Sequence, residues 1–591
     1  MREFFKYVFA TVLGVTISLA LIFFVFVAII IGVVSSTMDG DGQVAVTDNT
    51  VLYLNLDQAI TERTADDTFG NLPIVGGGGE KSIGFYDLKL ALENAKTDDH
   101  IKCIYVSVSS PNAGFATMKE VRDALIDFKT SGKKIVAYSE VYTQGAYYLA
   151  SVADKVYLNP EGALEFKGLS SKIMFFKGAL DKLGIEAQII RVGNYKSAVE
   201  PFFTDKMSDK NREQVTAYLG GLYQTFLAGI AKSRNISSVT LHELADDYKI
   251  QQPNDALKYK LIDGLRYKDQ VLDELKGLSG KEKKKNLTTV TINDYARNVI
   301  KEDGKSSKNK IAVIYANGDI MGGEGSDDQI GSERISRTIR KARMDSTVKA
   351  IVLRVNSPGG SALASDVIWR EITLAKKVKP VIASFGDVAA SGGYYIGCAA
   401  DSIFVQPNTI TGSIGVFGVI PNFQKLYNEK LGITFDGVKT GKYADIMSTD
   451  RPLTAGERLI IQNDVNRVYD GFITRVADGR KKSKAYIDSI GGGRVWVGTD
   501  AVRIGLADRT GSFDDAIHAA AKKGKLDDYK VVAYPELIDP WKAFIENTTD
   551  KVKVYYAKQE LGTHFHLYEQ IKSAISKSGV QTRMPFEIRV E

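Results

Sequence analysis

Ser391 lies in the stretch GDVAASGGYYIGCAAD, where an apolar run gives way to a helical pattern beside two glycines. An earlier stretch, EVYTQGAYYLASVADK, repeats this text and carries Gln144 in the place of Ser391. Lys196 shows the opposite pattern, because its counterpart in the later text is Ala444. A serine becomes a nucleophile when a base takes its proton, and a lysine amine with a lowered pKa is such a base. The complementary losses predict one Ser–Lys pair built from both repeats.

The repeated text keeps a nearly constant spacing along the 591-residue chain. Residues 101–111 align with residues 348–358 at an offset of 247, and residues 145–154 align with residues 392–401 at the same offset. Two later matches have offsets of 248 and 245. Chance similarity does not hold such a register over about 160 positions, so tandem copies of one domain are predicted.

Each copy alternates apolar runs with amphipathic patterns. In the later copy, IAVIYANG, AIVLRVNSPGG and PVIASFG have the composition of buried strands, whereas ERISRTIRKARMD and ASDVIWREITLAKKV have helical spacing. Strands that are apolar on both faces and alternate with helices are typical of mainly parallel sheets covered by helices. The predicted fold class is therefore α/β, with two tandem domains.

A long uncharged segment lies near the N-terminus. Residues 7–34 carry no charged side chain, and about 20 apolar residues suffice to cross the hydrocarbon core of a bilayer. Arg2 and Lys6 precede this segment, and Asp39 and Asp41 follow it. The positive-inside rule then places the residues before the segment in the cytoplasm and the rest of the chain outside. A cleaved signal peptide is the alternative, which the length of the run and the poor cleavage site disfavour.

Composition also divides the chain into segments. The polar, lysine-rich stretches LSGKEKKKNL and KEDGKSSKNK indicate a linker between the copies, with a helix expected at residues 294–301, and the glycine run at residues 71–79 predicts a loop. The predicted segments are a cytoplasmic N-terminus (1–6), a transmembrane anchor (7–34), a first copy (45–278), the linker (279–310), a second copy (311–540) and a C-terminal extension (541–591).

The remaining residues argue against several classes of function. The net charge of +6 is spread thinly, and the one dense basic run, Lys281–Lys285, is expected to be a solvated linker, so no nucleic-acid partner is predicted. Cys103 and Cys398 form no metal-binding pattern and are expected to be buried small residues. No histidine lies in a repeated turn, where a Ser-His-Asp triad would need its base, and His564 with His566 suits a surface pair. Neither a metal nor a cofactor is predicted.

Glycines near Ser391 favour a catalytic turn. Gly392 opens the predicted helix, and Gly359 with Gly360 ends the neighbouring strand, so their amides are placed to meet a developing oxyanion. The first copy reads SPNAG where the second reads SPGG, which is consistent with a lost site. Taken singly, Ser391 is more typical of a helix N-cap and Lys196 of a solvated surface charge, and only their reciprocal pattern favours catalysis.

Three motifs carry a resemblance to a known family. The SPGG turn, the ASGGYY element around Ser391 and the GNYKSA element around Lys196 resemble the signal peptide peptidase A family, also called protease IV or peptidase family S49, in its long, duplicated type. The resemblance covers residues 45–540 and implies tandem domains with the fold of the Clp protease–crotonase superfamily. Asn356 stands where some relatives carry aspartate, and no change of chemistry is expected from it.

The resemblance also implies roles and partners. It matches Ser391 to the nucleophile, Lys196 to the general base and Ser413 to a serine that hydrogen-bonds the lysine amine. It assigns the oxyanion hole to the backbone amides of three glycines, Gly359, Gly360 and Gly392. It further implies a bowl-shaped homotetramer that is anchored in the bacterial inner membrane, with its catalytic domains on the periplasmic side. The implied substrates are the signal peptide remnants left after preprotein processing.

Two other classes of function stay open at this stage. A crotonase-like acyl-CoA enzyme would use the same sheet and glycine turns to stabilise an enolate, but acyl-CoA is cytosolic and the predicted topology puts the domains outside. A non-catalytic membrane scaffold would not need the complementary serine and lysine. A membrane-anchored serine endopeptidase that hydrolyses extended apolar peptides accounts for more of the sequence.

Overall fold

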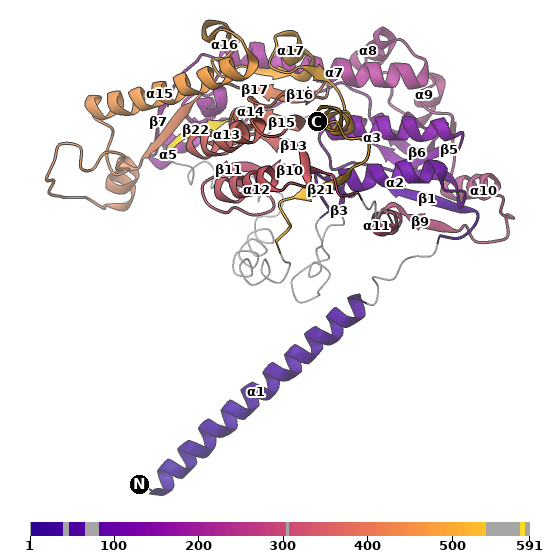
Figure 1. Cartoon of the computed structure of the whole chain (residues 1–591), viewed down its shortest axis with the longest axis horizontal. Helices are drawn as coiled ribbons and strands as arrows, with labels where there is room; N and C mark the ends of the chain where they lie inside the picture. The colour runs from indigo at the N-terminus through magenta and orange to yellow at the C-terminus, as the bar shows by residue number, and fades with distance from the viewer. Residues whose placement is uncertain (1, 39–45, 65–81, 303–306, 539–578, 585–591) are drawn as a thin grey trace.

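The computed structural model describes residues 2–38, 46–64, 82–302, 307–538 and 579–584. These residues form a body of two α/β units and a separate N-terminal helix, α1, Arg2–Met38 (Figure 1). The loop predicted at residues 71–79, the histidine pair near the C-terminus and most of the predicted extension lie outside the described residues.

The first copy is built on a six-stranded sheet in the order β8-β6-β5-β4-β1-β9, in which every neighbouring pair is parallel. Its central strands are buried on both faces, as their continuous apolar runs require. The strands are β1 (Thr50–Asn55), β4 (Ile101–Ser107), β5 (Lys134–Tyr142), β6 (Lys155–Leu164), β8 (Gly264–Leu265) and β9 (Thr289–Thr291). Two short strands, β2 (Ala59–Thr61) and β3 (Ser82–Gly84), pair beside it.

Helices cover this first sheet and extend beyond it (Figure 1). They are α2 (Phe85–Thr97), α3 (Phe115–Phe128), α4 (Gln144–Ala150), α5 (Lys177–Leu183), α6 (Glu200–Phe203), α7 (Asp209–Arg234), α8 (Ser238–Asp246), α9 (Pro253–Lys258), α10 (Lys268–Leu278) and α11 (Ile292–Glu302). Strand β9 and helix α11 fall inside the predicted linker. Because β9 pairs with β1 and α11 packs on α2, this part of the linker belongs to the first sheet.

The second copy repeats the architecture. Its sheet has the order β19-β17-β15-β13-β10-β21, with β16 between β15 and β20, and only the β17–β19 pair is antiparallel. The strands are β10 (Lys310–Asn317), β13 (Val348–Ser357), β15 (Val381–Ala390), β16 (Ser402–Val405), β17 (Ile410–Gly412), β19 (Val495–Val497), β20 (Arg509–Thr510) and β21 (Lys530–Tyr534). The helices are α12 (Ser332–Met344), α13 (Ala362–Lys376), α14 (Gly392–Gly397), α15 (Ala455–Arg480), α16 (Lys484–Ile490), α17 (Gly498–Arg503) and α18 (Phe513–Gly524). The predicted strands and helices of this copy are thereby confirmed.

A third sheet contains strands from both copies and from the C-terminus. Its order is β12-β11-β14-β22-β18-β7, and it is mixed. The strands are β7 (Glu186–Arg191) from the first copy, β11 (Asp319–Met321), β12 (Gln329–Gly331), β14 (Gly359–Ser361) and β18 (Phe417–Asn422) from the second, and β22 (Gly579–Arg583) from the predicted extension. The antiparallel pairing of β7 with β18 carries the residues that follow β7 to the second copy.

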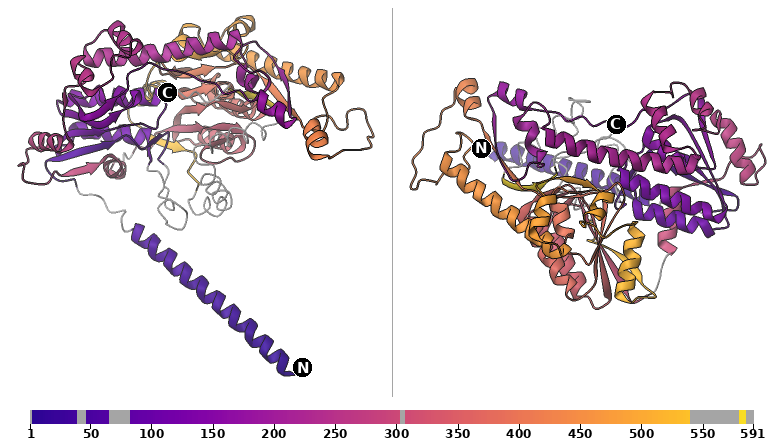
Figure 2. Two further views of the ribbon diagram at one scale, coloured as in Figure 1. Left: turned by 180° about the vertical axis from the view of Figure 1, so that it is seen from behind. Right: turned by 90° about the horizontal axis from the view of Figure 1, so that it is seen from above.

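Helix α7 ties the copies together from the outside. It runs from the first copy across the second (Figure 2). Val215, Tyr218 and Leu222 on this helix pack with Ile410 and Val495 of the second copy in one buried cluster. The two copies therefore share apolar packing as well as a sheet.

Candidate active site

Ser391 stands where strand β15 ends and helix α14 begins. Its backbone has φ 56° and ψ −115°, a conformation that strains a residue with a side chain. Two hydrogen bonds hold this turn: the Ser391 amide donates to Gly412 O at 2.8 Å, and the Tyr395 amide donates to Ser391 O at 2.8 Å. Ser391 is the N-cap residue of α14 by position, as the alternative expected, but its hydroxyl makes no capping hydrogen bond to the helix.

Lys196 reaches Ser391 because its own strand pairs with the other copy. It follows β7, and the β7–β18 ladder directs the chain into the second copy. The side chain is completely buried, so the alternative of a solvated surface charge is wrong. The Phe417 ring lies 5.9 Å from the Lys196 Nζ, which adds an aromatic wall to this enclosure.

The amine of Lys196 lies within hydrogen-bond distance of three oxygens. The Nζ is 2.9 Å from Ser391 Oγ, 3.0 Å from Ser413 Oγ and 3.1 Å from the Ser413 carbonyl oxygen. All three residues are fully buried. Burial lowers the pKa of Lys196 well below its ordinary value, because the charged ammonium loses its hydration. The structure thus brings together the three side chains that the sequence singled out.

The predicted oxyanion glycines converge beside this serine. Gly359 and Gly360 have φ 102° and 157°, which glycine adopts far more readily than other residues. A Cβ on Gly359 would lie 2.7 Å from the amide nitrogen of Gly392, so the SPGG turn and the start of α14 face each other closely. The Gly359 amide donates to Ser357 Oγ at 3.1 Å, and the Gly392 amide belongs to the first turn of α14, which lacks intrahelical acceptors.

A glycine run that the sequence analysis did not single out supports the lysine. A Cβ on Gly493 would lie 2.6 Å from the backbone of Lys196, and a Cβ on Gly193 would lie 2.3 Å from Gly492 O. Only glycines permit two backbones to approach so closely. The Tyr195 amide donates to Gly492 O at 3.0 Å and closes the contact. The sequence shows this glycine run as GGGR at residues 491–494, but no local pattern indicated that it would contact the backbone of Lys196.

Gln214 is a second residue that the sequence analysis missed. This fully buried side chain on α7 donates from Nε2 to the Tyr195 carbonyl oxygen at 3.0 Å and to Ser197 Oγ. Its Oε1 accepts from the Val495 amide at 3.2 Å. Gln214 thereby links the residues before and after Lys196, Tyr195 and Ser197, to Val495 on β19 of the second copy.

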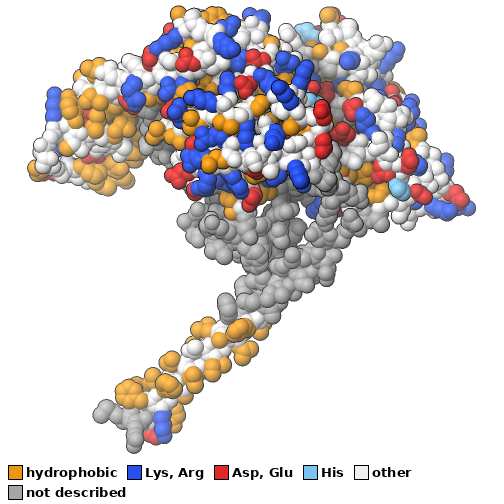
Figure 3. Space-filling model, viewed as in Figure 1, with side chains coloured by type: hydrophobic (Ala, Val, Ile, Leu, Met, Phe, Trp, Pro, Cys, Tyr) orange, Lys and Arg blue, Asp and Glu red, His pale blue; other side chains and the backbone are white. Residues whose placement is uncertain are grey.

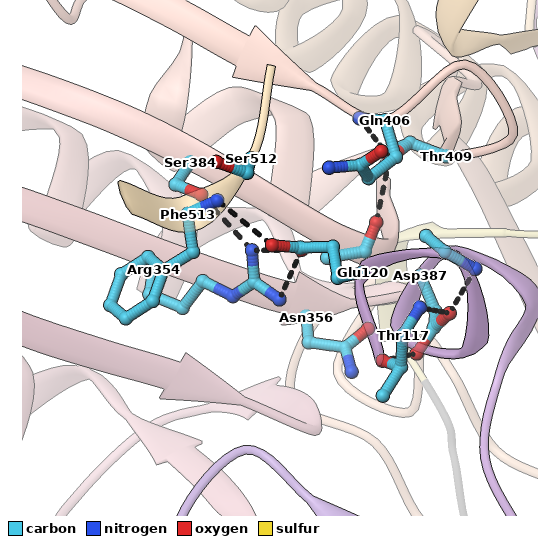
Figure 4. Close-up of polar contacts among 12 residues, drawn as sticks. Thr117, Glu120, Arg354, Asn356, Ser384, Asp387, Gln406, Thr409, Ser512 and Phe513 are labelled. Atoms are coloured by element: carbon cyan, nitrogen blue, oxygen red, sulfur yellow. Dashed lines mark hydrogen bonds and ion pairs between the residues drawn. The ribbon is translucent and has the colours of Figure 1, made fainter. Parts of the chain in front are cut away.

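A buried ionic cluster joins the two copies, and Figure 4 shows the part of it formed by Arg354 and Glu120. Arg354 on β13 donates from Nε to Glu62 at 2.8 Å and from Nη1 to Glu120 at 3.3 Å, both in the first copy. Burial opposes the charge of Arg354, but the two carboxylates raise its pKa above the ordinary value. Burial raises the pKa of Glu120. Because the charges face each other across the interface, separation of the copies would leave them unpaired.

Asp387 makes a second link, four residues before the serine. Its carboxylate accepts from the amides of Ala116 and Thr117 at 2.7 and 2.9 Å and from Thr117 Oγ1 at 2.6 Å (Figure 4). The carboxylate therefore caps the start of α3 in the first copy. Burial raises the pKa of Asp387 despite these donors. The strand that leads to Ser391 is thus tied directly to the first copy.

In the first copy, the position that corresponds to Ser391 is occupied by Gln144. Gln144 uses its side-chain oxygen to accept from the amides of Lys167 and Gly168, each at 3.0 Å, and its Nε2 donates to Gly168 O at 2.8 Å. The Gln144 side chain therefore makes hydrogen bonds to the neighbouring backbone at the position that corresponds to Ser391.

Both cysteines, Cys103 and Cys398, are free and buried, as predicted, and burial raises the pKa of each thiol to about 12. Across the described residues, no group of three or more His, Cys, Asp or Glu side chains is arranged to hold a metal ion.

Comparisons with known proteins agree with this architecture. The model of Peptidase family S49 matches the chain twice, at residues 127–282 and 373–527. Protease 4 of Haemophilus influenzae is 35% identical over 514 residues, which cover 84% of this chain and 83% of that protein. Serine protease SPPA, chloroplastic, of Arabidopsis thaliana is 34% identical over 454 residues, which cover 76% of this chain and 66% of that protein. Among solved structures, a ClpP1 mutant from Listeria monocytogenes covers 35% of this chain and 94% of its own length, with 17% identity and a TM-score of 0.24.

The duplicated α/β architecture, the two family-model matches and the similarity to Protease 4 define a class, the family S49 peptidases with two domains in one chain. The chain belongs to Peptidase family S49, and by family it is a serine peptidase. The predicted resemblance and the predicted tandem α/β fold are confirmed. The predicted domain boundaries stay predictions.

Proposed function

We propose that this chain is a membrane-anchored serine endopeptidase in which Ser391 is the nucleophile and Lys196 the general base. The observation that carries the proposal is the 2.9 Å contact between Lys196 Nζ and Ser391 Oγ, made between the two copies and sealed from solvent. Each copy alone lacks one of the two groups, because Gln144 and Ala444 stand at the corresponding positions.

The hydrogen-bond geometry suits a neutral lysine. A neutral amine has two N–H donors and one lone pair, and the three surrounding oxygens match these positions. The donors go to the carbonyl oxygen and Oγ of Ser413, at 3.1 and 3.0 Å, and the lone pair then faces the Ser391 hydroxyl. Ser413 is accordingly a positioning residue. Burial lowers the pKa of Lys196, and this direction favours the neutral amine that a general base requires.

The reaction follows from these positions. Lys196 takes the hydroxyl proton as Ser391 Oγ attacks the scissile carbonyl carbon, and the C–N bond breaks when the lysine returns the proton to the leaving amine. A water molecule, deprotonated by the same lysine, then hydrolyses the acyl-serine ester and frees the serine. Amides of the SPGG turn and of Gly392 bind the oxyanion, and each donor contributes about 3 to 4 kcal/mol in comparable sites.

The N-terminal helix supports membrane attachment. The apolar stretch Glu3–Ile22 of α1 is long enough to cross a bilayer, and its described side chains are exposed rather than packed on the body. Arg2 and Lys6, near the N-terminal end of this helix, orient the catalytic domains to the outer face of a bacterial cytoplasmic membrane, the periplasmic side. Apolar, extended peptides, of which signal peptide remnants are the example that the family resemblance implies, are the substrates available at that surface.

Two segments that correspond to β7 and β18 in the other copy form no strand, and they support a homo-oligomer. The family resemblance implies that this oligomer is a tetramer. At the repeat offset, residues 434–439 of the second copy correspond to β7, and residues 170–175 of the first copy correspond to β18. Neither segment forms a strand, and residues 431–444 are exposed throughout. Figure 3 shows apolar side chains gathered at the left end of the molecule, where this segment lies. The exposed apolar residues of the segment are Leu431, Ile433, Phe435, Val438 and Tyr443. A second chain would supply each segment with the partner that β7 and β18 find within one chain, and repeated head-to-tail contacts close a ring.

The oligomer has its own test. Val438→Asp should shift the mass of the detergent-solubilised chain toward the monomer in light scattering, because it places a charge in the proposed contact. Leu459→Asp, at an exposed position on α15, is the matched control and should leave the mass unchanged. Equal masses for both variants and the wild type would exclude this segment as the contact.

The dyad is tested by substitution and by labelling. Ser391→Ala and Lys196→Ala should each abolish peptidase activity, and a fluorophosphonate probe should label the wild type at Ser391 but not the Ser391→Ala variant. Full activity in either variant would end the proposal. Absence of both labelling and peptide hydrolysis in the wild type would instead favour the non-catalytic scaffold, and hydrolysis or isomerisation of acyl-CoA would favour the crotonase-like alternative.

A further inference from the structure

The segment that carries Lys196 ends in a buried carboxylate. We call residues 192–200 the lysine loop, and its last residue, Glu200, is 1% exposed. The Glu200 Oε1 accepts from Ser208 Oγ at 2.6 Å, and its Oε2 accepts from the Ser208 amide at 3.2 Å and from Asn211 Nδ2 at 2.9 Å. Ser208 is the N-cap of α7, so the carboxylate lies against the N-terminus of a 26-residue helix, where an anion is stabilised.

Hydrogen bonds continue from this carboxylate to the backbone around Lys196. The Asn211 Oδ1 accepts from Gln214 Nε2 at 3.3 Å, and the same Nε2 binds the carbonyl oxygen that precedes Lys196. Arg191 pairs with Glu200 at 3.8 Å, and its Nη1 donates to the Lys196 carbonyl oxygen at 3.2 Å. Two routes of polar contacts therefore connect Glu200 to the backbone that carries the amine.

The second copy lacks this carboxylate at the corresponding position. At the offset of 248 that aligns the lysine with its counterpart, Glu200 corresponds to Ser448. At the offset of 246 that aligns the N-caps of α7 and α15, Asn211 corresponds to Glu457. The first copy thus carries its buried carboxylate on the lysine loop, whereas the second copy carries one on the long helix itself.

The two corresponding loops also differ in burial. Residues 196–200 are all buried, whereas residues 444–448 are exposed or half-buried. Glu457 stays within its own copy, where it accepts from the Thr454 amide at 2.8 Å and pairs with Arg451 at 2.6 Å. The loop that holds the lysine is therefore packed and anchored to its helix by a carboxylate, and the loop without a lysine is not.

We propose that Glu200 is a positioning residue, whose carboxylate anchors the lysine loop on the N-terminus of α7 and thereby fixes the Lys196 amine beside Ser391. The inference rests on the proposed function, because it takes Lys196 as the general base. Burial lowers the pKa of Lys196, and Glu200 does not reverse this lowering. Glu200 accordingly acts on the position of the amine. A loop without this anchor would admit water to the amine and raise its pKa toward the ordinary value.

Replacement of Glu200 by glutamine tests the anchor. Glu200→Gln keeps the size of the side chain but turns one acceptor oxygen into an N–H donor, which faces the donors on Ser208 and Asn211. The readout is the rate at which a fluorophosphonate probe labels Ser391 in the detergent-solubilised chain, measured against probe concentration and pH. We expect the maximal rate to fall about 10- to 100-fold, since a misplacement of about 1 Å costs a factor of this order.

Two features of the labelling distinguish positioning from a loss of probe binding. The probe concentration that gives half of the maximal rate should change less than about twofold, because the residues that contact the probe are untouched. The pH at which labelling reaches half of its maximum should move upward, because a more hydrated amine has a higher pKa. A large rise in the half-saturating concentration with an unmoved pH midpoint would overturn the proposal.

Glu457→Gln is the matched control. Glu457 is as buried as Glu200 and also binds the start of a 26-residue helix, but it lies in the copy without the lysine. This variant should lower Tm without changing the labelling rate or its pH dependence. Equal losses of rate in Glu200→Gln and Glu457→Gln would overturn the proposal, and so would an unchanged rate in Glu200→Gln.

A milder pair of variants and a charge swap guard against a folding defect. Ser208→Ala removes one donor from the carboxylate and should move the rate and the pH midpoint in the same directions, whereas Thr454→Ala, at the N-cap of α15, should move neither. Glu200→Gln combined with Asn211→Asp returns a carboxylate to the N-terminus of α7 and should recover most of the lost rate. A lower Tm with an unmoved pH midpoint and no recovery in the double variant would show a structural role alone and overturn the proposal.

Failure of this inference is distinguishable from failure of the proposed function. Labelling of the chain at the wild-type rate in Lys196→Ala would refute the general base, whatever Glu200→Gln does. Loss of labelling in Lys196→Ala, combined with a wild-type rate in Glu200→Gln, would refute the positioning role of Glu200 alone.

Discussion

Replacement of Lys196 by methionine probes the protonation state on which the mechanism depends. Methionine is unbranched and apolar, so it fills most of the space of the lysine stem without an amine. We expect peptidase activity to fall at least about 100-fold, the lower end of what a general base contributes. Loss of activity alone would not show whether the buried amine is neutral, and the pH dependence of stability supplies that information.

The expected magnitude follows from proton linkage. Burial lowers the pKa of Lys196 well below that of a lysine in the unfolded chain, which is about 10.4. Between these two pKa values the unfolded chain binds a proton at residue 196 that the folded chain does not bind. The free energy of unfolding therefore rises with pH, by about 1.4 kcal/mol per pH unit for one proton. A lysine that is neutral in the folded chain from pH 7 to pH 9, as the general-base role requires, gives the wild type a gain of about 2.7 kcal/mol relative to Lys196→Met.

The assay is urea unfolding of the detergent-solubilised chain at pH 7, 8 and 9, followed by tryptophan fluorescence. The comparison of wild type with Lys196→Met cancels the titration of all other groups. Ser391→Ala keeps the lysine and should follow the wild-type slope. A difference between wild type and Lys196→Met that stays constant with pH would mean that the folded protein holds a charged ammonium, and it would refute a neutral general base.

Three other predictions follow from the contacts around the site. Arg354→Met should lower the free energy of unfolding by about 3 to 5 kcal/mol in urea titrations, because it leaves buried carboxylates unpaired; a change under 1 kcal/mol would contradict this. Gly493→Ala should reduce kcat several-fold because the added Cβ would push on the Lys196 backbone, whereas Gly132→Ala, which has a similar positive φ but open space around it, should leave kcat unchanged; equal rates in the two variants would contradict the glycine contact. Gln144→Ser should gain no fluorophosphonate label when Ser391 is also replaced by alanine, since Ala444 stands where the first copy has Lys196; labelling there would reveal a second site.

Much of the fold was predictable because its signals are local. Buried parallel strands are continuous apolar runs, and helices have their own spacing, so the elements of the second copy were found within a few residues of their observed bounds. The predicted linker was less accurate, because β9 is a three-residue strand whose pairing with β1 depends on residues more than two hundred positions earlier. Gln214 and Gly493 were missed for the same reason, since neither carries a local pattern that names its partner.

The sequence by itself determined the α/β class and the duplication, and it singled out Ser391 and Lys196 as the candidate pair, because two aligned copies display their differences position by position. Only the tertiary structure decided that the amine reaches the hydroxyl, since the β7–β18 ladder joins segments of different copies and no periodicity encodes it. The tertiary structure likewise decided that β22 lies between β14 and β18. Strand pairing over long separations is selected by the shape and hydrogen-bonding of the folded sheet edge, and that edge exists only once the chain has folded.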